Sequence, residues 1–459
     1  MTRVLEFIVA LIMVFILAVI VGLFLPSHAH IERSIDISHN PRHIYDVLNN
    51  FRRFHDYAGA SLRAEDPAVK FELSGPAYGP GATVSWNGDN VIGDGTLVNK
   101  SGTIDLALNS TVTWALTNGW HGKNKTFTFQ VTPREAQRVS RVTWSYDVDY
   151  GWNLIGRYSA LWIHGEPSTM IQYGLDQMQN MLAAIPNVDY ARMSPGIYKT
   201  DATPVLLIST KAARSLDDID ASKAAALKQV QGVMAKLGVK AAGPTTTITT
   251  EYGDTTYKFD LAVPINTTTL TIDGKAYDLT ALPARPTADQ FAAAPAASSS
   301  AGLPAAASST GAAVAAVGSL DKQNQLIVSG EVRARMMPAS EVLEATWTGE
   351  AGVPLMRLGL QAYASTHGYQ FDADTNRLYD QLASPAAADD QDQVYRVFLP
   401  VQDAPAQTPE QIAGRTTPLT ALDPSLWSTG AAAPAAEEKP EAKKPEPRKR
   451  PESKRRHRG

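Results

Sequence analysis

The first segment of the chain is uniformly hydrophobic. Val4 to Leu25 is apolar apart from Glu6, which lies near one end of the run. About 20 apolar residues are needed to cross the hydrocarbon core of a bilayer. A secretory signal has a shorter apolar run followed by a small-residue cleavage site, and Ser27-His28-Ala29 leaves that alternative open. We predict a transmembrane anchor over residues 1–27.

Hydrophobic and polar residues then alternate from Ile31 to about Asn187. Ile31–Ile37 has the pattern of a strand, Asn40-Pro41 begins a helix, and several strand-like runs follow between Gly, Pro and Asn residues. One face of these runs is apolar and the other is mostly Thr, Ser, Asn, Lys and Arg, which indicates antiparallel strands with one covered face. The covered face holds six large aromatic residues: Trp86, Trp114, Phe127, Phe129, Trp144 and Tyr146.

Apolar residues recur at helical spacing within Pro167–Ile185, so we predict a helix at the end of this segment. A sheet curved around this helix would enclose a cavity lined by the six rings, whereas a flatter sheet would pack them together as a core. The alternation is compatible with both. We predict an α+β domain over residues 30–187, with an antiparallel sheet and a long C-terminal helix, and we take the six aromatic residues as ligand-binding candidates.

A strand-helix-strand-strand order occurs twice between residues 203 and 402. The two halves end alike, in Phe259–Ile265 and Val394–Val401, and an insert rich in Ala, Ser and Pro separates them at residues 284–318. We therefore predict an internal duplication. Its first half has strands 205–210, 245–252 and 256–265 and helix 217–237, and its second half has strands 325–335, 378–382 and 394–401 and helix 353–367.

Composition narrows the chemistry that is possible. The 459 residues include no cysteine, which excludes disulfides, iron–sulfur clusters, thiol nucleophiles and cysteine-based zinc sites. The net charge of −4 gives no reason to expect a nucleic-acid partner. Residues 403–459 are rich in Pro and Ala, then in Lys, Arg and Glu, and we predict that this tail is disordered because it cannot bury enough apolar surface to fold.

The polar residues form no recognisable catalytic or metal-binding set. His28-x-His30 and the His39/His43 pair have spacings that suit a metal, but each lacks a third ligand. No two of the candidates for acid–base chemistry have the spacing of a dyad. We therefore predict no catalytic residue, no metal and no cofactor. The acid–base candidates are Asp89, Asp94, Tyr146, Asp147 and His164.

Several motifs in the 30–187 segment carry a family resemblance. They are Ile31–Asn49, Gly75-Pro76-x-x-Gly79-x-Gly81 followed by Trp86-Asn87-Gly88, Val142-Thr143-Trp144, and Gly174-Leu175. With these motifs the segment, about a third of the chain, resembles the START/SRPBCC superfamily, especially its polyketide cyclase/dehydrase-type members. The resemblance implies a helix-grip fold with a pocket for a hydrophobic ligand.

The 203–402 segment carries a second resemblance, in Tyr257–Ile265, Ala345–Gly349, Tyr379-Asp380 with Pro385, and Phe398–Val401. It looks like a GyrI-like (AraC-type effector-binding) domain. Members usually bind drug-like or amphipathic molecules in a groove between two modules, with a central Glu for which Asp380 is the nearest match here. The resemblance makes Trp347, Tyr379 and Asp380 candidates for a second ligand site.

These observations favour a bacterial, single-pass inner-membrane protein that binds a hydrophobic small molecule or lipid and has a possible second ligand-sensing module. It would contact the membrane through residues 4–25. Arg3 precedes the span and Arg33 and Arg42 follow it, so the charge count is nearly even. We expect periplasmic soluble domains, as is usual for such short leaders. Two alternatives stay open: a cyclase, dehydrase or hydrolase using the same cavity, and an envelope scaffold without a ligand.

Overall fold

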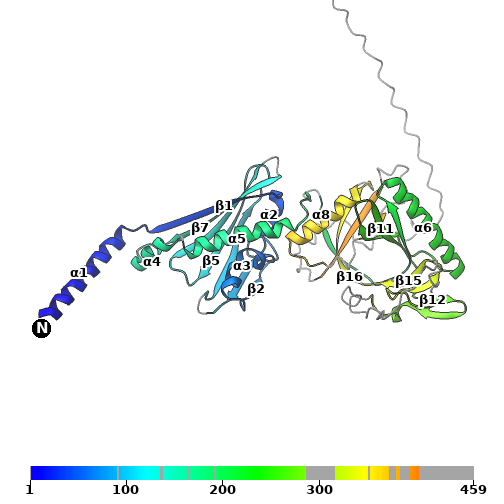
Figure 1. The fold of residues 1–459 in the computed structure, drawn as a ribbon, viewed down its shortest axis with the longest axis horizontal. Coiled ribbons are helices and arrows are strands. Elements are labelled where there is room, and N and C mark those ends of the chain that lie inside the picture. The colour runs from blue at the N-terminus through cyan, green and yellow to red at the C-terminus, as the bar shows by residue number, and fades with distance from the viewer. Residues whose placement is uncertain are drawn as a thin grey trace, which may run out of the picture.

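A computed structural model describes residues 2–402 apart from 90–91, 135–137, 164, 191–192, 194, 286–315, 350–351, 372–378 and 383–392. The predicted tail at 403–459, most of the predicted insert, and the acid–base candidate His164 lie outside the described residues. The described part is a mixed α+β structure with an apolar N-terminal helix and two large antiparallel sheets (Figure 1).

The N-terminal helix α1 (Thr2–Phe24) projects away from the rest of the protein (Figure 1). At 1.5 Å per residue its 23 residues extend for about 34 Å. Side chains such as Phe7 and Phe15 are exposed along its length. By length and composition α1 is able to span a bilayer, as the hydrophobic run predicts.

Seven antiparallel strands form the first sheet, in the order β1-β7-β6-β5-β4-β3-β2. Burial alternates along β5, β6 and β7, as the period of two predicts, and is strictly alternating in β7. The strands are β1 (His28–Ile37), β2 (Lys70–Ser74), β3 (Thr83–Asn87), β4 (Gly95–Thr103), β5 (Ser110–Asn118), β6 (Lys123–Arg134) and β7 (Val139–Asp149).

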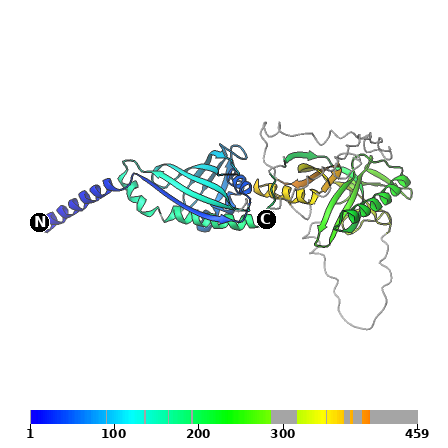
Figure 2. The ribbon, with the colours of Figure 1, turned by 90° about the horizontal axis from the view of Figure 1, so that it is seen from above.

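Helices cover the apolar face of this sheet. The predicted C-terminal helix is α5 (Glu166–Ala183), which runs along the sheet (Figure 2) and buries Ile171, Leu175 and Met178 against it. The predicted helix start at Asn40-Pro41 is also present, because the Asn40 side chain accepts a hydrogen bond from the backbone of Arg42 at 2.8 Å. The other helical segments are α2 (Pro41–Leu48), η1 (Phe54–Asp56), α3 (Ala58–Glu65), α4 (Leu154–Ser159) and η3 (Ala160–Trp162).

Nine antiparallel strands form the second sheet, in the order β14-β15-β9-β11-β10-β17-β18-β16-β8. The order is symmetrical about its centre, where β10 pairs with β17, since β9-β11-β10 on one side corresponds to β16-β18-β17 on the other. Helix α6 (Leu216–Leu237) follows β9, and α8 (Val353–Thr366) follows β16. The strands are β8 (Gly196–Thr200), β9 (Thr203–Ala213), β10 (Thr246–Tyr252), β11 (Thr256–Pro264), β14 (Leu326–Ser329), β15 (Val332–Met337), β16 (Ser340–Thr348), β17 (Tyr379–Leu382) and β18 (Val394–Val401), and a separate hairpin of β12 (Thr269–Ile272) and β13 (Lys275–Asp278) leads into η4 (Leu279–Ala281).

The single strand predicted over residues 325–335 is wrong. This segment is a hairpin of β14 and β15 that adds to the β9 edge of the sheet. Gly330, with a φ of +53°, supplies the left-handed backbone that the turn needs. The strand that precedes α8 is β16 instead, and it pairs with β8 and β18.

Candidate functional site

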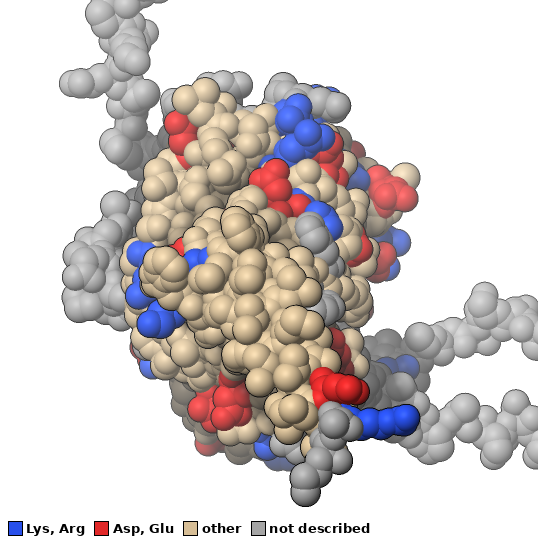
Figure 3. All heavy atoms as spheres, turned by 90° about the vertical axis from the view of Figure 1, so that its left-hand side faces the viewer, with Lys and Arg blue, Asp and Glu red and all other residues tan. Residues whose placement is uncertain are grey.

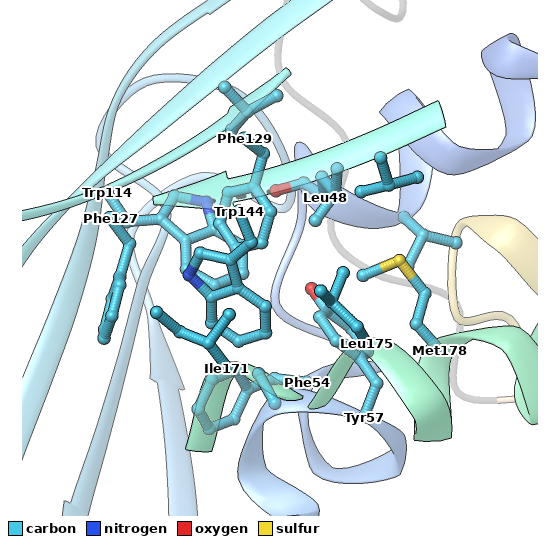
Figure 4. Close-up of a cluster of buried hydrophobic side chains, with 14 of the residues drawn as sticks. Leu48, Phe54, Tyr57, Trp114, Phe127, Phe129, Trp144, Ile171, Leu175 and Met178 are labelled. Atoms are coloured by element: carbon cyan, nitrogen blue, oxygen red, sulfur yellow. Dashed lines mark hydrogen bonds between the residues drawn. The ribbon is translucent and has the colours of Figure 1, made fainter. Parts of the chain in front are cut away.

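The aromatic residues predicted to line a cavity all lie on the covered face of the first sheet. Trp114, Phe127, Phe129 and Trp144 are fully buried at its centre. The ring of Phe129 lies 4.4 Å from that of Trp114 and 4.6 Å from that of Trp144, measured between centroids, and α5 packs over the group (Figure 4). These contacts fit the alternative that the rings fill the centre of the domain.

Trp86 and Tyr146 lie at the two sides of this aromatic cluster. Trp86 stacks with Phe54 of η1 at 6.3 Å between centroids, and Tyr146 contacts Phe127 at 5.2 Å. Both are buried. The six predicted residues are therefore neighbours on one face, as the alternation indicates.

The ring of Tyr57, which precedes α3, lies 6.5 Å from that of Trp114 and so belongs to the same cluster. Among the described residues, three buried polar atoms of the cluster have no hydrogen-bond partner: Trp86 Nε1, Trp144 Nε1 and Tyr57 Oη. By contrast, Trp114 Nε1 donates to the Leu48 carbonyl at 3.1 Å. Burial raises the pKa of Tyr57, so its hydroxyl stays protonated and able to donate. Leaving a buried donor unpaired costs about 1–3 kcal/mol, and an acceptor on a guest molecule would remove that cost.

An open hollow of about 570 Å³ lies beside the cluster, between the η1–α3 segment, β2 and the end of α8. We call it the junction groove, because residues of both sheet domains line it. The rings of Phe51, Phe54 and Phe71 form part of its wall. Phe51 in turn contacts Trp114 at 4.8 Å, so the groove reaches the outer side of the aromatic cluster.

The junction groove has a positively charged rim. Arg52, Arg63 and Lys70 line it together with His55, and no Asp or Glu is among its lining residues. The Arg63 guanidinium lies 5.8 Å from the centre of the Phe71 ring, so a cation stands directly over the apolar wall. A larger hollow of about 730 Å³ at the same sheet edge mixes charges, since Lys70, Glu72 and Asp94 all line it. The junction groove thus combines aromatic rings with an excess of cations.

The second domain supplies Gly368 and Gln370 to this groove. Arg52 Nε donates to the Gly368 carbonyl at 3.2 Å, which ties the rim of the groove to the loop that follows α8. A Cβ added at Gly368 would lie 2.4 Å from the Cβ of Arg52, so only glycine permits this approach.

A buried polar network holds α2 against α8. Asp46 accepts hydrogen bonds from Arg42 at 2.9 Å and from the Tyr190 hydroxyl at 2.8 Å. The same hydroxyl lies 2.8 Å from Thr366 Oγ1, and Asn50 Nδ2 donates to the Thr366 carbonyl at 3.1 Å. Because buried polar groups are costly unless paired, this network favours one fixed arrangement of the two helices.

Two histidines extend the network on the α2 side. His43 stacks on Tyr190 with ring planes 7° apart, and its Nε2 donates to the Val188 carbonyl at 2.8 Å. Its Nδ1 therefore accepts from His39 Nε2, at 3.1 Å. Burial lowers the pKa of His39 to about 4 and, together with the neighbouring His39, that of His43 to about 3. The two histidines are thus hydrogen-bonded to each other and to the backbone.

The structure does not bring Trp347, Tyr379 and Asp380 together. Asp380 is buried and bound to Arg357 of α8, whose Nη2 also donates to Tyr257 Oη at 2.9 Å. Tyr379 is its neighbour on β17 and so points to the opposite face of the sheet, where it stacks on Phe398 at 4.6 Å. Trp347 is partly exposed near the end of β16. Asp380 already has an internal cation as its partner.

The acid–base candidates are also separate. Asp147 accepts a hydrogen bond from His30 of β1 at 2.7 Å near the end of β7, and Asp94 lies in the mixed-charge hollow. Within the described ranges no group of three His, Cys, Asp or Glu side chains is placed to hold a metal ion.

Sequence reasoning missed the junction groove. Its local signal was Phe51-Arg52-Arg53-Phe54-His55, where basic residues stand between two aromatic ones. Arg63 and the β2 residues of the groove follow soon after it, but Gly368 and Gln370 come from more than 300 positions further along the chain, and no local pattern connects them to that segment.

No family model and no curated protein matches the sequence. Among solved structures, truncated norcoclaurine synthase from Thalictrum flavum is 11% identical and is similar over 34% of this chain and 94% of its own, with a TM-score of 0.25. A START superfamily protein from Mycobacterium smegmatis is 10% identical over 33% of this chain and 98% of its own, with a TM-score of 0.25. The EcmrR C-terminal domain is 9% identical over 46% of this chain and 99% of its own, with a TM-score of 0.28. Likenesses this remote assign no activity to the chain.

Proposed function

We propose that the protein is a membrane-anchored binding protein for a hydrophobic small molecule or lipid. In this proposal α1 anchors it in the inner membrane with the two domains in the periplasm, and residues 30–187 form a helix-grip domain of the START/SRPBCC type. Residues 203–402 form a duplicated, GyrI-like domain. The observation that carries the proposal is the junction groove, with its aromatic wall and its acid-free, basic rim.

The shape and charge of the groove favour an amphiphile with an anionic group. Pockets for small ligands have volumes of about 300–1,000 Å³ and combine apolar walls with a few polar groups, and the groove, at about 570 Å³, falls in this range. The rings of Phe51, Phe54 and Phe71 suit a hydrocarbon or aromatic tail. Arg52 and Arg63 suit a carboxylate or phosphate, since charged hydrogen bonds of this kind are the stronger ones.

The duplicated domain has a part in this site, because Gly368 and Gln370 complete the groove. A ligand there would touch both domains at once, next to the network that joins α2 to α8. We therefore assign the ligand-sensing role of the second domain to its contact with this groove, and not to Asp380, whose carboxylate is bound to Arg357.

A photoreactive fatty acid tests the proposal. The full chain in lipid nanodiscs is exposed to a diazirine-bearing hexadecanoic acid or to its methyl ester, irradiated, and digested for mass spectrometry. We expect the acid to label peptides of β2 and of the loop at Gly368. Arg63→Gln should lower that labelling roughly tenfold to a hundredfold, as loss of a charged hydrogen bond worth roughly 1.5–3 kcal/mol predicts. Lys123→Gln, which removes an exposed cation from β6, is the matched control and should have no effect.

Two other labelling results would contradict this expectation. Equal labelling by acid and ester would keep a hydrophobic ligand but reject an anionic one. No labelling of the groove by either probe would reject the proposal.

The second candidate, a scaffold without a ligand, is favoured by the packed rings at the centre of the first sheet. It would gain support from unlabelled grooves together with a native mass spectrum of the full chain that shows no bound guest.

A further inference from the structure

An unusual apolar patch surrounds the short helix α4. Trp152, Ile155 and Leu161 are 84%, 70% and 58% exposed. Outside α1, they are three of the four most exposed large hydrophobic side chains in the described part of the chain, and the fourth is Leu108. Between residues 152 and 163 the only charged residue is Arg157. Clustered exposure of this kind marks a surface that contacts something apolar.

The patch lies directly beside the C-terminal end of α1. The Tyr158 hydroxyl donates to the Ala18 carbonyl at 2.6 Å, and Arg157 Nη1 donates to the Leu23 carbonyl at 2.8 Å. Gly22 lets the two helices approach, since a Cβ there would lie 3.1 Å from the Tyr158 ring. Figure 3, which views the molecule from the α1 side, shows a broad uncharged face with charged residues towards its edge.

The contact positions give the depth of α4 along α1. Ala18 lies six residues before Phe24, the last residue of α1, which corresponds to about 9 Å of helix. Helices that lie in a membrane interface bury their apolar face by about 5–10 Å. If α1 crosses the bilayer, α4 therefore lies at the boundary between headgroups and hydrocarbon. Tyr and Trp are enriched at this depth.

Arg157 suits the same place. It donates to the carbonyls of Leu23, in the last turn of α1, and Leu25, just after the helix, and its guanidinium lies 5.5 Å from the centre of the Trp152 ring. Unpaired carbonyls are costly where water is scarce, so this pairing allows α1 to end inside the interface.

We propose that residues 152–163 are a second membrane contact, which lies in the same leaflet in which α1 ends. This inference rests on the proposed membrane anchor. It also has a structural consequence, because α1 leads into β1 and α4 follows β7, and these two strands are paired. With both attached to the bilayer, the first sheet is held in a fixed orientation to the membrane instead of moving on a single tether.

The absence of cysteine from the sequence makes a clean test possible. Ile155→Cys and, as the matched control, the equally exposed Leu108→Cys are each labelled with the environment-sensitive fluorophore NBD in the full chain. Both proteins are placed in phosphatidylcholine nanodiscs. We expect NBD at residue 155 to have blue-shifted emission, to be quenched by doxyl-labelled lipid, and to lose quenching by iodide. NBD at residue 108 should behave as if in water.

Two different failures can be distinguished. If the chain enters nanodiscs but the label at residue 155 is quenched by iodide as strongly as that at residue 108, the inference is overturned and the anchor stands. If the chain does not enter nanodiscs at all, the anchor itself is rejected and the inference with it. Both substituted side chains are exposed, so neither change removes a core contact.

Discussion

The contact between Arg357 and Asp380 gives the sharpest prediction about the second domain. Arg357 extends from α8 to Asp380 on β17 and to Tyr257 on β11, so it joins the two symmetrical halves of the sheet. Both charged residues are buried. If Asp380 served mainly to bind a ligand, its replacement would leave the fold unchanged. If it is the partner of Arg357, its replacement leaves a buried cation without a counter-charge.

The free-energy cost of such a replacement follows from the burial of both charges. Removing one member of a buried ion pair costs about 3–5 kcal/mol, because the remaining charge stays desolvated. We therefore expect Asp380→Asn and Arg357→Met each to destabilise the second domain by about this amount. The double variant Arg357→Met/Asp380→Val removes both charges, and replacing a buried pair by apolar residues is often neutral or stabilising. Its cost should accordingly be much smaller than the sum of the two single costs.

Hydrogen–deuterium exchange of the full chain measures the loss of stability in each domain separately. A loss of 3–5 kcal/mol would speed the exchange of β10 and β18 peptides by roughly a hundredfold to several thousandfold, since about 1.4 kcal/mol corresponds to a factor of ten. Peptides of β5 and β6 in the first sheet serve as the internal control and should not change. Unchanged exchange in Asp380→Asn, or additive costs in the double variant, would refute the reasoning.

Two further predictions concern the junction between the domains. Gly368→Ala places a Cβ 2.4 Å from that of Arg52, at a φ of +69°, so it should loosen the α2–α8 contact and speed hydrogen–deuterium exchange in α2. The control is Gly330→Ala, where φ is a similar +53° but no atom lies close to the added Cβ, and it should leave exchange in α2 unchanged. Burial lowers the pKa of His39 to about 4 and of His43 to about 3 from the ordinary value of 6.5, so the unfolded chain takes up protons first as the pH falls. The stabilisation from these neutral histidines is complete above pH 6.5 and is lost towards pH 4, so the melting temperature should fall over that range. His43→Gln should flatten the slope, and an unchanged slope would count against the assignment.

The sequence predicted those parts of the fold that depend on local pattern. The alternation in 142–148 placed Trp144 and Tyr146 on the covered face, because a strand turns successive residues to opposite sides whatever surrounds it. The start of α2 followed from a capping residue and a proline, which are also local. The hairpin at Gly330 was missed because β-branched and basic residues continue the strand pattern through it.

Other properties depend on packing between distant segments. Whether the rings of Trp114 and Trp144 enclose a cavity is decided by how closely α5 approaches the sheet. Gly174 brings α5 so near that an added Cβ would lie 2.6 Å from the Trp144 ring. The partner of Asp380 could not be predicted either. Arg357 lies on α8, 23 positions earlier in the chain, and no local pattern pairs the two residues.

The arrangement of the parts indicates how a ligand would be handled. Helices α1 and α4 lie at one end of the first domain, and α2 and the contact with α8 lie at the other (Figure 1). Strand β1 connects the two ends, and its ten residues correspond to about 33 Å at the usual rise per residue. If α1 spans a bilayer, the junction groove would lie roughly that far from it, because Phe51, Arg52, Phe54 and His55 of the groove follow α2 directly in the chain. An amphiphile would have to leave the membrane completely to bind there, which makes a carrier or sensor of free ligand a better fit to this geometry than a protein that samples lipids within the leaflet.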